Sequence, residues 1–261
     1  MPATEHVLVE IDGPVAVLTF NRPDARNAMS WAMYDALVEA CDRVDTEADV
    51  RVFVLRGAGG TFVSGTDIAQ FTSFERPEDG LAYERQLDEV MDRLERVRKP
   101  TIAQVEGVAA GGGCAIALAC DLRICTPDAR FGVPIARTLG NCLSAANHAR
   151  LLDLIGPARL KDLLFTGRFI HAPEAASLGL VTSIAEPDDL PRAVRELALR
   201  IAGHAPLTIQ ATKEMVRRIQ AARRLDIAEA RDLIERCYTS DDFREGVQAF
   251  LAKRPPVWTG R

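Results

Sequence analysis

Gly107-Val108-Ala109-Ala110-Gly111-Gly112-Gly113-Cys114 and Phe62-Val63-Ser64-Gly65-Thr66-Asp67-Ile68 are the two stretches that decide the fold of this chain. Each follows a short apolar segment that predicts a buried strand. Glycine lets a ligand approach the backbone closely because no Cβ is in the way. Each stretch can therefore place a bare N–H group at the wall of a pocket. Two such groups aimed at one point form an oxyanion hole, which holds a carbonyl oxygen as it gains negative charge.

Each stretch also has a purely structural explanation. The glycine triplet lies between an apolar strand and an Ala-rich helix that we expect to end near Ala119. A helix N-terminus offers free N–H groups and positive potential to an oxyanion, but close packing of a helix against a strand also favours small residues. Ser64-Gly65-Thr66-Asp67 offers the N–H of Thr66 as a donor. It is equally compatible with an ordinary turn, in which Asp67 caps the next turn or binds a ligand amine.

Composition and charge narrow the class of protein. The 261 residues suffice for one large domain or one domain plus a small appendage, and 48% hydrophobic with 26% charged residues is typical of a globular protein. A net charge of −5 argues against nucleic-acid binding, and we see neither a signal peptide nor an apolar run of about 18 residues that would span a membrane. The six cysteines form no Cys-x-x-Cys pair. We therefore expect no metal site or disulfide framework, and a reduced, cytoplasmic protein.

Hydrophobic periodicity predicts recurring strand, turn and helix units, which suit an α/β layered core. We expect a hairpin over residues 7–20, a helix that Ser30 caps and that ends near Asp45, mobile polar residues at 72–80, and a helix over 81–98. Further strands are expected at residues 52–55, 101–105 and 122–125. After residue 185 only helices are expected, at 191–202, 208–221, 227–239 and 241–252. We therefore divide the chain into a core, residues 1–190, and a helical C-terminal region, residues 191–261, which packs on the core or on a neighbouring subunit.

The ordered set of motifs resembles the crotonase (enoyl-CoA hydratase/isomerase) superfamily over nearly the whole chain. Asn21-Arg22-Pro23 with Asn27-Ala28 resembles its N-terminal loop, and the two glycine stretches resemble its two oxyanion loops. The other matching stretches are Ala119-Cys120-Asp121-Leu122, Phe131-Gly132-Val133-Pro134, Leu164-Phe165-Thr166-Gly167-Arg168, residues 175–181, Glu245-Gly246, Ala249-Phe250 and Lys253-Arg254.

This resemblance implies a spiral of β-β-α turns with a C-terminal α-helical region, assembled as a homotrimer or a dimer of trimers. It implies an acyl-CoA substrate, with coenzyme A as part of that substrate and no tightly bound cofactor. The N–H groups of Thr66 and Gly112 would hold the thioester oxygen and stabilise an enolate. The residues implied in binding the substrate are Arg26, Ala28, Ser64, Gly65, Asp67, Ile68, Gly111, Phe250 and Lys253. Phe250 and Lys253 could bind coenzyme A in the pocket of their own subunit or of a neighbouring one. Lys253 is also explained as a solvated charge at a helix end.

The chain departs from the family at two positions. Hydratases of the family use two glutamates, one two residues after the glycine triplet and one directly after the proline of Phe-Gly-x-Pro. Here Ala115 and Ile135 occupy these positions, and residues 108–120 and 130–140 contain no Asp or Glu. Neither side chain can carry a proton, so water addition to an enoyl double bond lacks both expected catalysts.

Other residues are candidates for the missing chemistry. Cys142 follows Gly140-Asn141, and one branch of the family has a nucleophilic Asp at this position. A Cys142 thiolate with a lowered pKa could attack a carbonyl carbon. Alternatively, Cys142 is a small core residue. His148 could act as a base. It lies six residues after Cys142, however, and residues at this spacing do not share one face of a helix. Arg137 could meet a substrate carboxylate or phosphate, or a surface Glu. Asp67, Glu75 and Glu84 lie where some branches place an alternative base, and each is also explained as a solvated charge.

We therefore interpret the chain as an acyl-CoA enzyme of the hydratase/isomerase type that keeps the oxyanion hole and uses a non-standard proton-transfer group. An isomerase, a hydrolase and a lyase acting on CoA thioesters all remain open. The alternative is a catalytically silent acyl-CoA-binding protein that has kept the pocket and lost the chemistry.

Overall fold

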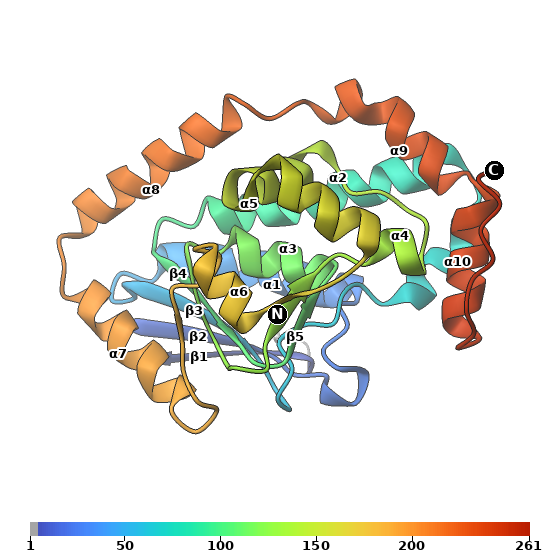
Figure 1. The fold of residues 1–261 in the computed structure, drawn as a ribbon. Helices are drawn as coiled ribbons and strands as arrows, with labels where there is room; N and C mark the ends of the chain where they lie inside the picture. The colour runs from blue at the N-terminus through green and yellow to red at the C-terminus, as the bar shows by residue number, and fades with distance from the viewer. Residues whose placement is uncertain (1–4) are drawn as a thin grey trace.

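The computed structural model describes residues 5–261, which form an α/β fold of two sheets with helices packed around them (Figure 1). The larger sheet has the strand order β1-β2-β3-β4-β6-β9. β1 and β2 form an antiparallel hairpin, and the later pairings of this sheet are parallel. Its strands are β1 (Val7–Asp12), β2 (Val15–Phe20), β3 (Val52–Gly57), β4 (Thr101–Val105), β6 (Leu122–Cys125) and β9 (Ser183–Ile184).

A smaller sheet with the order β5-β7-β8 continues from the oxyanion loops. β5 and β7 are parallel, and β7 pairs with β8 antiparallel. From β4 onward the chain alternates between the sheets: β4 and β6 join the larger sheet, and β5 and β7, which follow them, join the smaller one. The strands of this sheet are β5 (Val108–Ala110), β7 (Arg130–Gly132) and β8 (Ile170–His171).

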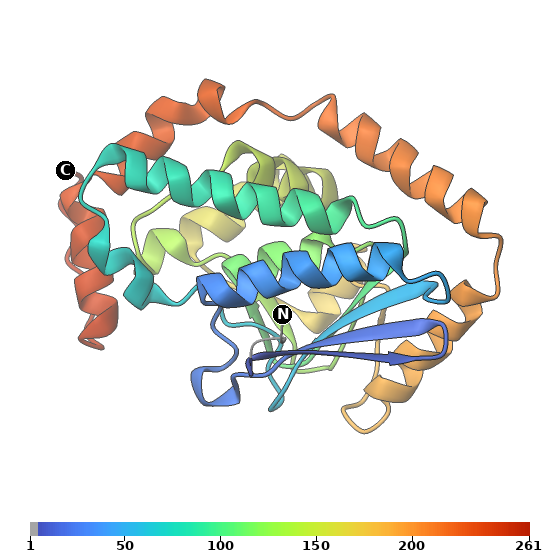
Figure 2. The ribbon, with the colours of Figure 1, turned by 180° about the vertical axis from the view of Figure 1, so that it is seen from behind.

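Helices cover both faces of the larger sheet, as the two opposite views show (Figures 1 and 2). One face packs on the main core, to which α1, α2 and α3 contribute. The other face is covered by α7, whose Leu190, Val194 and Ala198 pack on Val52 and Val54 of β3. The helices are α1 (Trp31–Thr46), α2 (Pro77–Glu95), α3 (Gly112–Ala119), α4 (Ile135–Thr138), α5 (Ala145–Thr166), α6 (Ala172–Ser177), α7 (Leu190–Ala202), α8 (Pro206–Ala221), α9 (Arg231–Tyr238) and α10 (Asp241–Leu251), with 3-10 turns η1 (Pro23–Ala25), η2 (Ile68–Ser73) and η3 (Ile227–Ala230).

Most predicted elements are confirmed, because their signals are local. The hairpin forms as expected, and Ser30 caps α1 by accepting a hydrogen bond from the N–H of Met33. Residues 72–80 include the ends of two elements, η2 and α2, and their mobility stays a prediction. α2 already begins at Pro77, because Pro fits the first helical turn and Asp79 accepts hydrogen bonds from the N–H groups of Glu75 and Arg76.

The C-terminal helices α7 to α10 form an arc around the rest of the molecule (Figures 1 and 2). α9 packs on α2, and α10 packs on η2 and α4. α7 covers one face of the larger sheet and so packs on the core. The division of the chain into two regions at residue 190 stays a prediction. Within residues 5–261, no helix is both long and apolar enough to cross a membrane.

α2 and α5 are joined by a buried ion cluster around Glu95. Arg150 and Arg224 each donate two hydrogen bonds to its carboxylate, at 2.8 to 3.1 Å. Burial alone would raise the pKa of Glu95, but these two guanidinium groups outweigh burial and lower the pKa to about 2. The cluster therefore favours the ionised form and connects α2 both to α5 and to the segment after α8.

We predict that Glu95→Gln lowers the free energy of unfolding at pH 7 by about 3 kcal/mol. Because the pKa of Glu95 is depressed in the folded state, its contribution is complete above the ordinary Glu pKa and is lost as the pH falls from about 5 to about 2. Urea unfolding of both proteins at several pH values measures the difference, which should shrink towards low pH. Glu89→Gln, at an exposed position of the same helix, is the control and should change little. A difference independent of pH would contradict this assignment.

Candidate active site

The two glycine loops meet edge to edge. The N–H of Val63 donates to Val108 O at 3.1 Å, and the N–H of Ala110 donates to Val63 O at 3.0 Å. Gly65 and Gly111 have φ values of 124° and 49°, which L side chains rarely adopt. A Cβ on Gly111 would lie 3.7 Å from the Cα of Gly65, an ordinary van der Waals distance, so it is the positive φ rather than space that favours glycine there. The glycines are therefore needed for the loop geometry as well as for ligand access.

Two residues that line the pocket at this junction have backbone N–H groups without a protein acceptor in the described part of the chain. Thr66 and Gly112 line the same pocket, and a Cβ on Gly112 would lie 3.1 Å from Thr66 Oγ1. In the part of the chain that the structure describes, neither backbone N–H donates to another protein group. Gly112 is the first residue of α3, where a helical N–H has no acceptor within the helix. Both groups are thus available to one ligand oxygen.

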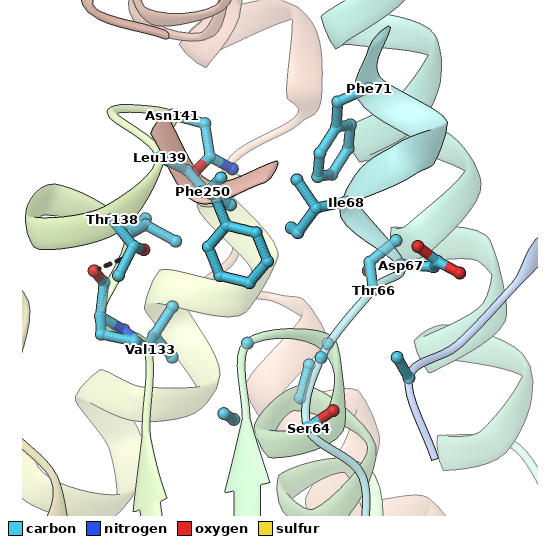
Figure 3. A pocket seen from close by; sticks show the side chains of 18 of the residues that line it. Ser64, Thr66, Asp67, Ile68, Phe71, Val133, Thr138, Leu139, Asn141 and Phe250 are labelled. Carbon is cyan, nitrogen blue, oxygen red and sulfur yellow. Dashed lines mark hydrogen bonds between the residues drawn. The ribbon is translucent and has the colours of Figure 1, made fainter. Parts of the chain in front are cut away.

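The pocket has a volume of about 500 Å³ and is built from segments far apart in the chain. Figure 3 shows Phe250 projecting between a wall that carries Val133 and Thr138 and a wall that carries Ser64 and Ile68. Phe250 belongs to α10 of the same chain and lines the pocket, whereas a contribution across a subunit boundary stays a prediction. The predicted residues that line the pocket are Arg26, Ala28, Ser64, Gly65, Thr66, Asp67, Ile68, Gly111, Gly112 and Phe250.

The rim of the pocket carries two cations. Arg26 and Arg130 are exposed and line the pocket, and neither has a carboxylate within 4.0 Å among residues 5–261. The Arg130 guanidinium lies over the ring of Phe169, 5.4 Å from its centroid. Arg130 was missed in the sequence because it is a single charge on a short strand. Both cations are free to meet anionic groups of a ligand.

Asp67 is engaged within the protein. Its Oδ2 accepts a hydrogen bond from Arg22 at 2.8 Å, and its Oδ1 caps η2 through the N–H of Ala69. Arg22 also donates to Ala28 O. The Asp67 carboxylate therefore joins the N-terminal loop to the first glycine loop. Asp67 also lines the pocket.

Ala115 and Ile135 both line the pocket. The two positions at which the resemblance implies glutamates thus face the ligand space, and both present carbon only. Beside them, Thr66 Oγ1 bonds the hydroxyls of Tyr34 at 2.8 Å and Tyr83 at 2.9 Å. This network fixes the first loop against α1 and α2.

Glu84 is the ionisable residue that the sequence interpretation placed wrongly. The alternative of a solvated charge is wrong for it, because Glu84 is 1% exposed and lines the pocket. A signal was present: Glu84 stands three residues from both Leu81 and Leu87, within the apolar stripe of α2. Glu75, by contrast, is exposed and lies outside the pocket lining.

Four predicted residues do not reach the pocket. The thiol of Cys142 points to α9, where it lies 3.8 Å from Leu233 O, and a hydrogen bond with Cys237 together with burial raises its pKa. A raised pKa opposes the thiolate form, which is contrary to what a nucleophile needs. The Nδ1 of His148 lies 3.0 Å from Ser144 O. Arg137 and Lys253 are exposed side chains outside the pocket lining.

A spiral of alternating strands in two sheets, with a pocket between two glycine loops, defines the crotonase class of fold. The chain belongs to the enoyl-CoA hydratase/isomerase family, whose model matches residues 10–261.

Named relatives agree with this assignment. The short-chain-enoyl-CoA hydratase of Clostridium acetobutylicum is 34% identical, with 95% of each chain covered, and the 2,3-dehydroadipyl-CoA hydratase of Escherichia coli is 34% identical over 95% of this chain and 96% of the relative. The solved structure of methylmalonyl-CoA decarboxylase in complex with 2-nitronate-propionyl-CoA has a TM-score of 0.91 at 28% identity, covering 98% of this chain and 99% of that one. The expected fold class is confirmed, and an enzyme of this family is supported.

We predict that losing the Gly112 N–H lowers turnover of a thioester substrate by about 100- to 1,000-fold. Any Cβ at this position would lie 2.3 Å from the Tyr34 hydroxyl, so the test uses a Tyr34→Phe background. Gly112→Pro removes the N–H, whereas Gly112→Ala adds a Cβ and keeps the N–H. The ratio of kcat/KM between these two variants isolates the donor. Equal rates in the two would show that the N–H has no role.

Proposed function

We propose that the protein binds an acyl-CoA thioester and stabilises its enolate between the N–H groups of Thr66 and Gly112. The observation that carries this proposal is the pair of unpaired donors in one pocket, beside a rim with two free cations. A thioester oxygen that gains charge in this position would be held by dipoles already in place. Arg26 and Arg130 are suited to the phosphates of coenzyme A.

The reaction that we propose is not ordinary hydration. Hydration needs one group to activate water and one group to deliver a proton, and the family positions for these groups hold Ala115 and Ile135. The relatives named as hydratases support the CoA thioester as substrate class. The likeness to methylmalonyl-CoA decarboxylase supports an enolate reaction without added water. A lyase or isomerase reaction with a different proton-transfer group fits these observations, and the hydrolase alternative would add water at the thioester carbonyl instead of at the double bond.

One observation favours a second candidate, a silent acyl-CoA-binding protein. The two apolar residues at the expected catalytic positions leave the oxyanion donors intact, as loss of chemistry with retention of binding would. Both candidates bind acyl-CoA, but only the enzyme converts it to a product.

A cytoplasmic location stays a prediction from the cysteine usage.

We predict binding of acyl-CoAs without hydration of crotonyl-CoA. The purified protein is incubated with crotonyl-CoA, 3-butenoyl-CoA and saturated acyl-CoAs, and the products are followed by mass spectrometry alongside calorimetric binding. Conversion of any thioester other than by hydration supports the enzyme, whereas binding without any product favours the silent protein. Hydration of crotonyl-CoA at an ordinary enzyme rate of about 10 s⁻¹ would contradict the argument from Ala115 and Ile135. Absence of all thioester binding would overturn both candidates.

We also propose a homotrimer or a dimer of trimers. α8 has no buried residue, and the apolar side chains of Leu207, Met215, Val216 and Ile219 on it are 50% to 75% exposed. An apolar helix face of this size indicates burial against another surface. We expect sedimentation equilibrium to give a trimer or hexamer, and Met215→Glu with Ile219→Glu to give smaller species. A monomer of the unaltered chain at micromolar concentration would contradict this assembly.

A further inference from the structure

A glutamate of α2 lines the pocket, although both family positions for glutamate are apolar. Glu84 lines the same pocket as Ala115, Ile135, Thr66 and Gly112, and its preceding residue, Tyr83, bonds Thr66 Oγ1 at 2.9 Å. Glu84 therefore reaches the pocket from a different element than the glutamates that the family carries at positions 115 and 135. It comes from a helix rather than from the second loop or the strand after it.

The contacts of Glu84 hold its carboxyl group in one place. The hydroxyl of Tyr238 donates to Oε1 at 2.6 Å, and the N–H of Ser144 donates to Oε2 at 2.8 Å. Each carboxylate oxygen offers two lone pairs, so one site on each oxygen remains free. Asn141 donates to the Tyr238 hydroxyl at 3.1 Å, which makes a chain of hydrogen bonds from the pocket wall to Glu84.

A purely structural role for Glu84 fits these contacts less well. Glu95, on the same helix, shows what a buried structural carboxylate looks like here: two arginines neutralise it and lower its pKa to about 2. Glu84 has no Lys, Arg or His within 4.0 Å among residues 5–261. Burial raises its pKa to about 8, with a further contribution from the negative charge of Asp88. A carboxyl group without a cation is costly to bury for stability alone, but is ready to exchange a proton near neutral pH.

A second observation marks this end of the pocket as a ligand site. Asn141 lines the pocket, its side chain projects towards the space beside Phe250 in Figure 3, and its Oδ1 is buried without a hydrogen-bond partner in residues 5–261. A buried unpaired acceptor is costly, and a bound molecule that donates a hydrogen bond would remove this cost. The orphan acceptor lies two hydrogen bonds from the Glu84 carboxyl.

We propose that Glu84 is the catalytic proton carrier of this site, acting at the α-carbon of the bound acyl-CoA. The proposal rests on the function proposed above, because the enolate must be stabilised by Thr66 and Gly112. The carboxylate takes the α-proton, the C–H electron pair forms the Cα=C bond, and the thioester oxygen takes up the negative charge. The proton then returns from Glu84 to Cα, or to Cγ where a β,γ double bond lies in conjugation, which moves the double bond.

A single proton carrier limits the reactions that the site can perform. Exchange at Cα, migration of a double bond and protonation of an enolate formed by loss of CO₂ each require one group that moves one proton. Hydration requires a second group for water, and the two wall positions available for it carry Ala115 and Ile135. Glu84 therefore determines the class of reaction as well as its rate.

The test is exchange of the α-protons of bound thioesters with solvent, followed by NMR in D₂O. The probes are butyryl-CoA, octanoyl-CoA and phenylacetyl-CoA, whose benzylic α-protons are the most acidic of the three. We expect the unaltered protein to exchange at least one of them, and Glu84→Gln to exchange it at least 100-fold more slowly while its dissociation constant changes only a few-fold. Asp88→Asn is the matched control and should exchange at close to the unaltered rate above the midpoint, because Asp88 lies one turn further on α2, also contacts Ser144 and does not line the pocket.

The pH profile gives a second measurement that does not depend on how well Glu84→Gln folds. Tyr238→Phe removes a hydrogen bond that lowers the pKa of Glu84, so the midpoint of the exchange rate should move to higher pH. Asp88→Asn removes a nearby negative charge and should move it to lower pH. The titratable groups facing Glu84 are Asp88 and Tyr83 on α2, Tyr34 on α1, Cys142 before α5 and Tyr238 on α9.

The outcomes separate this inference from the proposed function. Exchange in Glu84→Gln at the unaltered rate, or an unmoved midpoint in Tyr238→Phe, would overturn the role of Glu84 and leave the oxyanion hole standing. Binding of all three thioesters without exchange would also overturn it and favour the silent protein. Failure to bind any of them would overturn the proposed function itself.

Discussion

The contact between the backbones of the two glycine loops is the constraint on which the rest of this structure depends. Val63 is hydrogen-bonded through both its N–H and its carbonyl to the strand β5, and a Cβ on Gly113 would lie only 2.1 Å from Val63 O. The loops can approach this closely only because residue 113 has no side chain. That approach places the start of α3 beside Thr66, and so brings the two unpaired N–H groups into one pocket.

Local signals made this part of the molecule predictable. Glycines at loop positions, a serine before a helix and short apolar strands each act over a few residues, and the structure follows them. The burial of Glu84 depends on partners that are 60 and 154 residues away, Ser144 and Tyr238. The apolar stripe of α2 indicated that position 84 faces inward, but a single charged residue in such a stripe is easily assigned to its edge. The position of the Cys142 thiol against α9 likewise depends on a contact 91 residues away.

Two glutamates on one helix show how environment, rather than residue type, sets chemistry. Glu84 is buried and Glu95 half-buried on α2, yet their pKa values move in opposite directions. Two guanidinium groups offset the cost of burying the first charge, whereas the second has only a hydroxyl and an N–H as donors. A neutral donor offsets less of the desolvation cost than a cation does. The same helix therefore holds one carboxylate that stabilises the fold and one carboxyl group that can gain or lose a proton.

The division of labour in the pocket follows from this difference. The oxyanion donors are backbone groups, so the side chains around them can change while the donors remain. Apolar residues at positions 115 and 135 then remove the means of handling water without disturbing the hole. In the proposed mechanism, the Glu84 carboxyl group of α2 acts on the same space from another side and moves a single proton. In the proposed function, the wall that supplies the proton carrier decides the reaction, while the two loops hold the thioester oxygen.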